Sequence, residues 1–193
     1  MLTELKPGAN ALALDQQAGA LIRSLGAEPT FLGYRGFARN ICISLNDEVI
    51  HGVAKASSIL KDGDLITLDI GVTYQGYVVD AAFSHIIGSG SAATKRINQV
   101  TQQALADGIA AIKPGVRAGA IGAAIQQTVE SNGYFLLEDF TGHGSGLELH
   151  EDPAISNFGP VDHGPKLKPN MTICIEPMVM TGSNGYVLDP DDG

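Results

Sequence analysis

The sequence predicts an α+β fold built from two halves of similar plan. Three segments space their apolar residues as helices do, at residues 9–25, 93–112 and about 118–131, and extended stretches lie between them. One extended stretch, residues 65–86, has the pattern of a long β-hairpin. Short sequence patterns also recur at a fixed distance, which indicates an internal repeat. Helices that alternate with antiparallel hairpins are typical of the α+β class.

The first helix is expected over residues 9–25, because its apolar residues recur at helical spacing and Gly26 follows as a typical stop. The third helix precedes Gly133 in the same way. Besides the hairpin, the sequence predicts extended segments at residues 40–53, 134–138 and 171–180.

Length and composition indicate one globular domain, expected to cover residues 1–193. The chain is 44% hydrophobic and contains 24 glycines, which suits a sizeable core. Its net charge of −9 argues against nucleic acid as a partner, because nucleic-acid-binding faces are basic. No apolar run reaches the length of a membrane span, and residues 1–10 lack the apolar core of a signal peptide. Two cysteines, Cys42 and Cys174, form no framework of disulfides and fit a reducing cytoplasm.

The hairpin carries one carboxylate in the interior of each strand, Asp69 and Asp80. A turn at Tyr74-Gln75 would set the two residues roughly opposite each other on one face. Carboxylates with Cβ atoms about 5 Å apart repel each other and lose solvation. A bound divalent cation removes this cost, and carboxylate oxygens suit Mn, Mg, Ca, Fe or Co. The alternative is a pair of solvated aspartates on the open face of an edge hairpin.

The internal repeat extends this reasoning to the second half of the chain. Lys6-Pro7-Gly8 recurs 107 positions later as Lys113-Pro114-Gly115, and two further matches, Gly26 with Gly133 and Leu60-Lys61 with Leu167-Lys168, have the same spacing. The same shift carries Asp69 to Glu176. We therefore expect Glu176 in a second hairpin, with the acids of both hairpins brought together between two halves related by a pseudo-twofold axis.

The repeat also predicts a returning strand with a further acid after Glu176. The chain instead continues through turn-like sequence that contains Asp189, Asp191 and Asp192 and reaches Gly193. We therefore expect the domain to be incomplete at its C-terminus.

Three of the five histidines have neighbouring residues that are consistent with metal binding or a role in catalysis. His143 is surrounded by glycines in residues 141–146, which let a large group approach closely, and a neutral imidazole there is a natural metal ligand. Its alternative is a histidine in a flexible glycine-rich loop. His150 precedes Glu151-Asp152-Pro153 and could orient a substrate, donate a proton or cap the following turn. His51, beside Gly52 at the end of an apolar run, could be only a satisfied core or rim histidine.

Together these motifs resemble the metal-site signature of the methionine aminopeptidases. The resemblance spans nearly the whole chain and rests on three segments: Asp69 to Asp80, eleven residues apart; Gly142-His143-Gly144 followed by His150-Glu151-Asp152-Pro153; and Ile175-Glu176-Pro177-Met178. It implies the pita-bread, or creatinase/aminopeptidase, fold of two related halves with an antiparallel sheet covered by helices. His143 and Glu176 are 33 residues apart, too close for the inserted subdomain of the type II enzymes, so the bacterial-style type I class is the better match.

The resemblance also implies a site and a reaction. A pair of divalent cations, of Co, Mn, Fe or Zn, would be bound by four residues: Asp69, Asp80, His143 and Glu176. Catalysis would involve three residues: His150, Glu176 and His51. The substrate would be contacted by His51 and His150, and its methionine side chain by Tyr34, Phe37 and Cys42. The implied activity is removal of N-terminal methionine from peptides and nascent proteins by a cytoplasmic monomer.

The chain departs from the family pattern in places. The family's bridging glutamate and a pocket tryptophan have no counterpart, and the usual helix before Lys6-Pro7-Gly8 is missing, so we expect the domain to be short at its N-terminus. Arg35 stands where bacterial members often carry histidine, and Phe31 takes a pocket position that is often smaller. Two alternatives stay open: an X-Pro-type aminopeptidase of the same fold, and a truncated or non-catalytic member that acts only as a binder.

Overall fold

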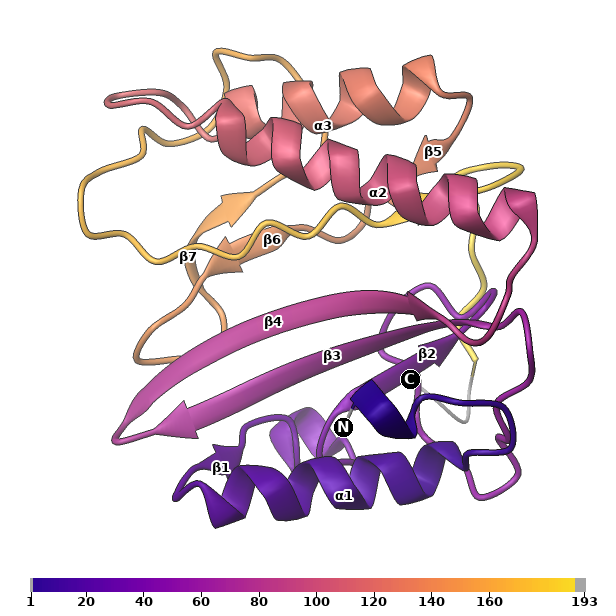
Figure 1. Ribbon diagram of the computed structural model, residues 1–193. Coiled ribbons are helices and arrows are strands. Elements are labelled where there is room, and N and C mark those ends of the chain that lie inside the picture. The colour runs from indigo at the N-terminus through magenta and orange to yellow at the C-terminus, as the bar shows by residue number, and fades with distance from the viewer. Residues whose placement is uncertain (1, 190–193) are drawn as a thin grey trace. The chain divides into compact units, whose positions relative to one another are not determined.

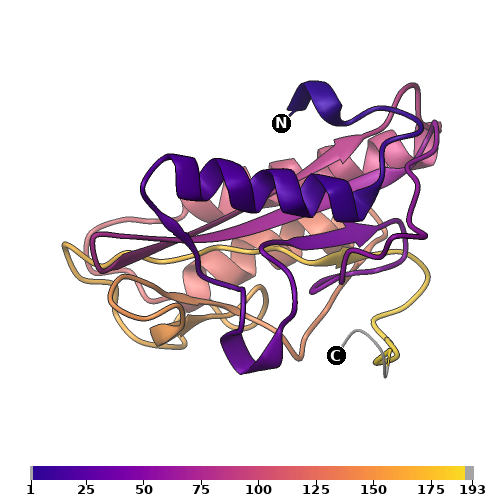
Figure 2. The ribbon, with the colours of Figure 1, turned by 90° about the horizontal axis from the view of Figure 1, so that it is seen from below.

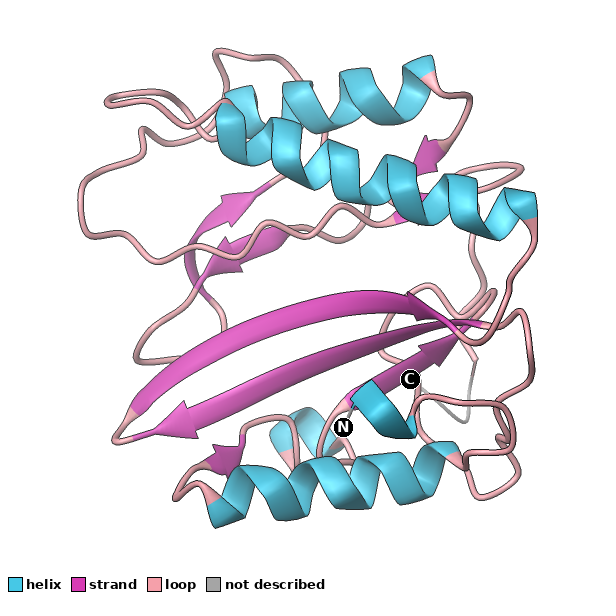
Figure 3. Ribbon diagram, in the orientation of Figure 1, coloured by secondary structure: helices cyan, strands magenta, loops and turns pink. Residues whose placement is uncertain are grey.

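The structure, a computed structural model, describes residues 2–189 and divides into two units. The first unit comprises residues 2–95 together with residues 188 and 189, and the second comprises residues 96–187. Figure 3 distinguishes their helices and strands by colour. The C-terminal residues at which we expect the domain to be incomplete, including Asp191, Asp192 and Gly193, lie outside the described residues. No helix within residues 2–189 combines the length and the apolar character that a membrane crossing needs.

The first unit is built around a central strand, β3. Its elements are η1 (Leu2–Glu4), α1 (Ala11–Ser24), β1 (Glu28–Pro29), η2 (Tyr34–Gly36), β2 (Cys42–Leu45), β3 (Leu65–Tyr74) and β4 (Tyr77–Ile86). β3 pairs antiparallel with β4 along one edge and with β1 and β2 along the other. α1 lies along one face of this sheet, as Figures 1 and 2 show from two directions.

Local sequence features define α1, and the predicted helix over residues 9–25 is confirmed. The Asn10 side chain accepts a hydrogen bond from the Ala13 backbone N–H at 3.0 Å and caps the first turn. Gly26 follows the helix at a φ of 77°, a left-handed conformation that glycine adopts at little cost. The buried side chains between these ends join the sheet in a core that includes Leu14, Ala18, Ile22, Ile66 and Leu68.

The turn between β3 and β4 lies one residue later than the sequence analysis placed it. Gln75 and Gly76 form the turn with φ values of 52° and 83°, and Tyr74 pairs with Tyr77. A two-residue turn with positive φ at both positions matches the twist of the strands, and Gly76 fits the second position readily. The expected turn at Tyr74-Gln75 is therefore wrong.

This turn also changes the relation between the two hairpin acids. Asp69 pairs with Ala82, and Asp80 pairs with Gly71. The expected direct opposition of the two aspartates is therefore wrong. They are diagonal neighbours on the same face of the sheet, a relation in which Cα atoms are typically about 7–8 Å apart.

The second unit contains two helices and two short antiparallel sheets. Its elements are α2 (Ala92–Ala110), which begins in the first unit, α3 (Gly119–Ser131), β5 (Phe135–Leu136), β6 (Gly142–Gly144), β7 (Glu151–Ile155) and β8 (Val179–Met180). β5 pairs with β8, and β6 pairs with β7. A Cβ atom at Gly108 of α2 would lie 2.9 Å from the Ile125 side chain of α3, so glycine permits the close approach of these helices.

The predicted helices at residues 93–112 and 118–131 are confirmed, but the extended segments are shorter than predicted. Within residues 171–180 the regular pairing is limited to β8 and an isolated bridge at Ile173. No strand follows β8 within residues 181–189. Helices alternate with antiparallel sheets in both units, which confirms the α+β prediction.

The internal repeat is confirmed at the level of backbone pairing. Several contacts in the first unit recur 107 positions later in the second, among them Ala11–Ser58 and Ala118–Pro165, Asn10–Ile59 and Arg117–Lys166, and Pro29–Val72 and Leu136–Val179. The shift that relates Asp69 to Glu176 therefore relates the backbone frameworks that carry them.

Candidate metal centre

In the first unit, the two acids lie on the face of the sheet that α1 does not cover. Ile66 and Leu68 of β3 are fully buried in the core beneath α1, and because side chains alternate along a strand, Asp69 points to the other face. Asp80 shares that face through its pairing with Gly71. This acid face is therefore separated from the apolar core by the sheet itself.

Two neutral side chains border the acid face. Cys42 of β2 pairs directly with Asp69, and only 5% of its surface is exposed. A Cβ atom at Gly71 would lie 2.4 Å from the ring of Phe31, so the missing side chain at Gly71 makes room for this aromatic ring. The two acids thus lie beside a buried thiol and an aromatic wall.

The Cys42 thiol is held in its protonated form. Burial raises the pKa of Cys42 far above the usual range of a thiol, and the charges of Asp69 and Asp80 raise it further. A thiol that stays protonated and buried is a poor nucleophile, because the thiolate is the reactive form.

We therefore predict unequal labelling of the two cysteines. In chelator-treated native protein at pH 8, Cys42 should react with iodoacetamide roughly tenfold or more slowly than the half-buried Cys174, because reactivity follows thiolate fraction and access. Peptide mass mapping after timed quenching measures both rates. Protein unfolded in guanidinium is the control and should label both residues alike. Equal rates in the native protein would contradict the prediction.

In the second unit, three potential ligands lie close together: His143, Cys174 and Glu176. Cys174 N–H donates to the His143 carbonyl oxygen at 2.7 Å, and Gly144 forms a bridge with Ile173. His143 and Cys174 are therefore neighbours across this pairing. Glu176 follows two residues later, outside any assigned strand, so the expected second hairpin around it is wrong. One ligand atom from each of the three residues lies within 4.8 Å of the other two.

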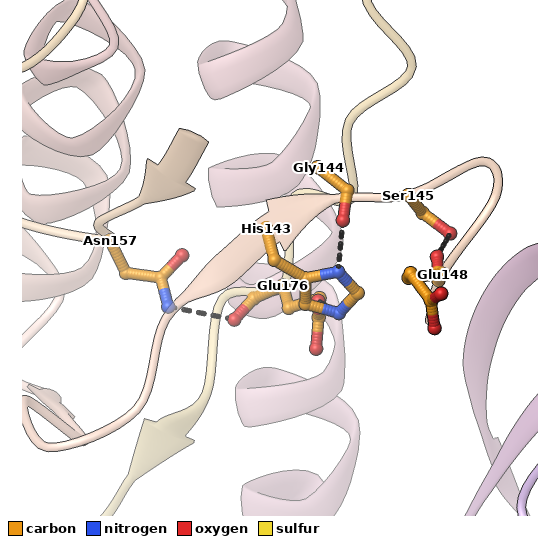
Figure 4. A network of polar contacts seen from close by, with 6 residues as sticks. All are labelled: His143, Gly144, Ser145, Glu148, Asn157 and Glu176. Carbon is orange, nitrogen blue, oxygen red and sulfur yellow. Dashed lines mark hydrogen bonds and ion pairs between the residues drawn. The ribbon is translucent and has the colours of Figure 1, made fainter. Parts of the chain in front are cut away.

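The hydrogen bonding of His143 leaves the lone pair of the neutral ring on Nε2. His143 Nδ1 lies 2.9 Å from the Gly144 carbonyl oxygen (Figure 4). A carbonyl can only accept, so this contact requires the proton on Nδ1 and, in the neutral ring, the lone pair on Nε2. Such a backbone contact is the usual way in which a metal-binding histidine is oriented.

The lone pair of His143 Nε2 faces another acceptor. Glu176 Oε1 lies 3.2 Å from Nε2, and this oxygen is buried and accepts no hydrogen bond from the described residues. A buried carboxylate oxygen without a donor is costly. A cation next to both atoms would satisfy them, so the side chains present fit a divalent metal.

Backbone contacts hold this arrangement in place. Asn157, which is fully buried, donates from Nδ2 to the Glu176 carbonyl oxygen at 2.8 Å (Figure 4). A Cβ atom at Gly142 would lie 2.2 Å from the Cys174 carbonyl oxygen, so only glycine permits this strand contact. The glycines beside His143 therefore serve close pairing of β6, and the alternative of a flexible loop histidine is wrong.

The other predicted site residues divide between the two units. His150 is exposed just before β7, and its ring centroid lies 4.3 Å from that of His143 in the same unit. Glu151 Oε1 accepts hydrogen bonds from the backbone of Leu147 and Glu148 and shapes the loop before His150. The remaining predicted residues belong to the first unit: exposed His51, half-buried Tyr34 and Phe37, and buried Cys42.

Two residues beside His143 and Glu176 were not predicted from the sequence as parts of the site. In the sequence, Cys174 indicates a reducing compartment and a small buried hydrophobe, although its position two residues before Glu176 is the signal that could have placed it in the site. Asn157 gives no local signal, because its contact with Glu176 spans 19 residues.

Comparison with known proteins gives consistent matches. The family model described as metallopeptidase family M24 matches residues 1–190. Methionine aminopeptidase 1 of Bacillus subtilis is 44% identical over 179 residues, which cover 93% of this chain and 72% of that protein. The methionine aminopeptidase of Thermotoga maritima aligns with a TM-score of 0.95 at 38% identity, over 98% of this chain and 76% of that one. The prolidase of Pyrococcus furiosus aligns with a TM-score of 0.79 at 27% identity, over 91% of this chain and 50% of that one.

Proposed function

Because the chain belongs to the metallopeptidase M24 family, we propose that it is a methionine aminopeptidase that removes N-terminal methionine from peptides and nascent proteins. The observation that carries the metal chemistry is the buried Glu176 Oε1, which lacks a hydrogen-bond donor and lies 3.2 Å from His143 Nε2. The 44% identity to a methionine aminopeptidase supports the choice of substrate.

We assign the metal ligands to both units: Asp69 and Asp80 from the first, His143 and Glu176 from the second. Three carboxylates and one imidazole suit two divalent cations of the Co, Mn, Fe or Zn type. When bound, such cations lower the pKa of a shared water and polarise the carbonyl of the peptide bond. The shift of 107 positions that relates Asp69 to Glu176 supports equivalent roles for these two acids.

The protein's own side chains would orient the substrate and move protons. A third of the Glu176 side chain is exposed, so its carboxylate is open to accept a proton from an attacking water. His150, exposed and in ring contact with His143, and His51, exposed beside Gly52, are assigned to the substrate near the scissile bond.

The methionine side chain is assigned to a pocket lined by Tyr34, Phe37 and Cys42. All three lie in the first unit, and Cys42 pairs with Asp69, so the pocket wall and a metal ligand share neighbouring strands. Aromatic rings and a neutral thiol suit a thioether, which is polarizable and apolar. The ring of Phe31 beside Gly71 would narrow the same region.

The proposal also covers the cellular location of the protein, its oligomeric state and its substrates. Nascent proteins carry their initiator methionine in the cytoplasm, and we place the enzyme there as a monomer. Neither Cys42 nor Cys174, both within the described residues, forms a disulfide, as suits a reducing compartment. The net charge of −9 supports peptide rather than nucleic-acid substrates.

The test is methionine release from a Met-Ala-Ser peptide by the 193-residue chain with Mn(II) or Co(II) added. We expect release that stops with a chelator and in the variant Asp80→Asn, because Asp80 is assigned to the metal. An Xaa-Pro peptide is the matched comparison, since prolidases share the fold. Cleavage of Xaa-Pro but not Met-Ala-Ser would replace the proposed substrate class, and cleavage of neither would contradict the proposed activity.

A further inference from the structure

We propose that Cys174 supplies a thiolate ligand to the metal held by His143 and Glu176. The inference rests on the proposed function, because it adds a sulfur donor to a site otherwise made of oxygen and nitrogen ligands. It assigns the second cysteine of the chain to metal binding rather than to packing. The chemical class of ligand it would take is a divalent cation of intermediate softness, such as Zn(II), Co(II) or Cd(II).

The first support is the position of Cys174 between the other two ligands. Its backbone N–H bonds to the His143 carbonyl oxygen at 2.7 Å, and it stands two residues before Glu176. The backbone hydrogen bond sets Cys174 beside His143, and the closeness of the ligand atoms shows that all three side chains are directed to one place. A sulfur, a nitrogen and an oxygen atom from these residues lie within 4.8 Å of one another.

These separations are close to those around a metal ion. Ligand atoms about 2.0–2.3 Å from a zinc ion lie about 3–4 Å from one another. The 3.2 Å between His143 Nε2 and Glu176 Oε1 already falls in this range. Side-chain adjustments of about an ångström would bring the sulfur atom to the same distance.

An independent observation points to a cation at this place. Glu176 Oε1 is buried and accepts no hydrogen bond from the described residues, while the Nδ1 proton of His143 is directed to the Gly144 carbonyl. Two acceptor atoms therefore converge where Cys174 also offers a sulfur atom. A bound cation would neutralise the carboxylate, and the thiol proton would leave to bulk water as the sulfur–metal bond forms.

A sulfur ligand changes which metals the site prefers. Thiolates favour Zn(II) and Co(II) over Mn(II) and Mg(II), which prefer oxygen ligands. The chain should therefore bind Zn(II) more tightly than Mn(II), by a margin that depends on Cys174. The difference between Zn(II) and Mn(II) affinity distinguishes two roles for Cys174. A metal ligand would affect mainly Zn(II), whereas loss of a packing residue would weaken the binding of all metals alike.

The experiment is anaerobic titration of metal-free 193-residue protein with Co(II), followed by absorption in the near ultraviolet. Wild type should show a sulfur-to-cobalt charge-transfer band, and Cys174→Ser should lack it. Cys42→Ser is the matched control and should keep the band, because Cys174 is then the sole cysteine of the sequence. In competition titrations, Cys174→Ser should bind Zn(II) at least about tenfold more weakly than wild type. Mutation of a residue that only hydrogen-bonds a metal ligand already causes a loss of about this size. Its Mn(II) affinity should change much less.

Each result decides the proposal. A wild type that binds Co(II) and releases methionine without a charge-transfer band would overturn the sulfur ligand and leave the proposed function standing. A band that persists in Cys174→Ser, or disappears in Cys42→Ser, would also overturn it. Failure of wild type to bind Co(II) and to release methionine would overturn both. Should Cys174→Ser fail to fold, the spectra of wild type and Cys42→Ser still decide.

Discussion

Replacing Glu176 with glutamine should lower kcat/KM for metal-dependent methionine release by about a thousandfold and, at the same time, raise the melting temperature of the metal-free protein. The two effects have one cause. Glu176 Oε1 is buried without a hydrogen-bond donor and lies 3.2 Å from the acceptor Nε2 of His143. Without metal this arrangement is unfavourable, and in the proposed site both atoms would become metal ligands. Function and stability therefore place opposite demands on this residue.

The expected sizes follow from the environment of the two carboxylate oxygens. Loss of a charged ligand that also accepts a proton should lower kcat/KM by about a thousandfold, or about 4 kcal/mol. An unsatisfied buried polar group costs about 1–3 kcal/mol, and since a third of the side chain is exposed we expect the lower end of that range. For a chain of this length about 1 kcal/mol corresponds to a rise of about 2–4 °C. Glutamine gains in addition an N–H group that can donate to His143 Nε2.

Calorimetry with and without Mn(II) measures both sides of this prediction. At a metal concentration of 100 times Kd, wild type should gain about 2.7 kcal/mol of stability, and Glu176→Gln should gain almost none. Glu138→Gln, an exposed change in the same unit, is the control and should alter neither the melting temperature nor the metal response. A metal-free Glu176→Gln protein that melts below wild type would refute the argument, because it would mean that Oε1 is satisfied.

The parts of this fold that could be predicted from sequence are those set by local contacts. Asn10 and Gly26 mark the ends of α1 within a few residues of the helix itself, and the repeat copies one backbone plan 107 positions along. The same shift identified Glu176 as the counterpart of Asp69. Each of these signals lies in residue type and spacing, which the sequence contains directly.

The parts that could not be predicted depend on register and on distant partners. The hairpin turn moved by one residue because Gln75 and Gly76 both adopt positive φ, and this changed the pairing of Asp69. A one-residue change in register is enough to alter every cross-strand neighbour. His143 and Cys174 are brought together by a backbone hydrogen bond between residues 31 positions apart, and no local sequence pattern indicates that contact.

The clearest example of a distant contact is Asp15, for which we predict the second large effect. Replacing Asp15 with alanine should destabilise the protein by about 3–5 kcal/mol, because the side chain is 2% exposed and accepts several hydrogen bonds. Its Oδ1 accepts from the backbone N–H groups of Asn40 at 2.7 Å and Ile41 at 3.1 Å, and its Oδ2 accepts from Asn40 Nδ2 at 2.9 Å. Alanine would leave these donors without their partner.

Thermal unfolding should therefore show a fall of about 10 °C for Asp15→Ala, given about 2–4 °C for each kcal/mol in a chain of this length. Asp15→Asn keeps one acceptor oxygen and should fall between alanine and wild type. Gln17→Ala, exposed on the same helix, is the matched control and should stay within about 0.5 kcal/mol of wild type. An alanine variant as stable as this control would show that the Asn40 and Ile41 amides find other partners.

Asp15 also helps to position the strand β2, which borders the proposed site. Asn40 and Ile41 lead directly into β2, whose first residue, Cys42, pairs with Asp69. Asp15 thus links α1 on one face of the sheet to the strand that borders the acids on the other. At a temperature where Asp15→Ala is still folded, we expect a weaker metal response than in Gln17→Ala, because the strand beside Asp69 is less firmly held. An equal metal response in the two variants would confine Asp15 to a role in stability.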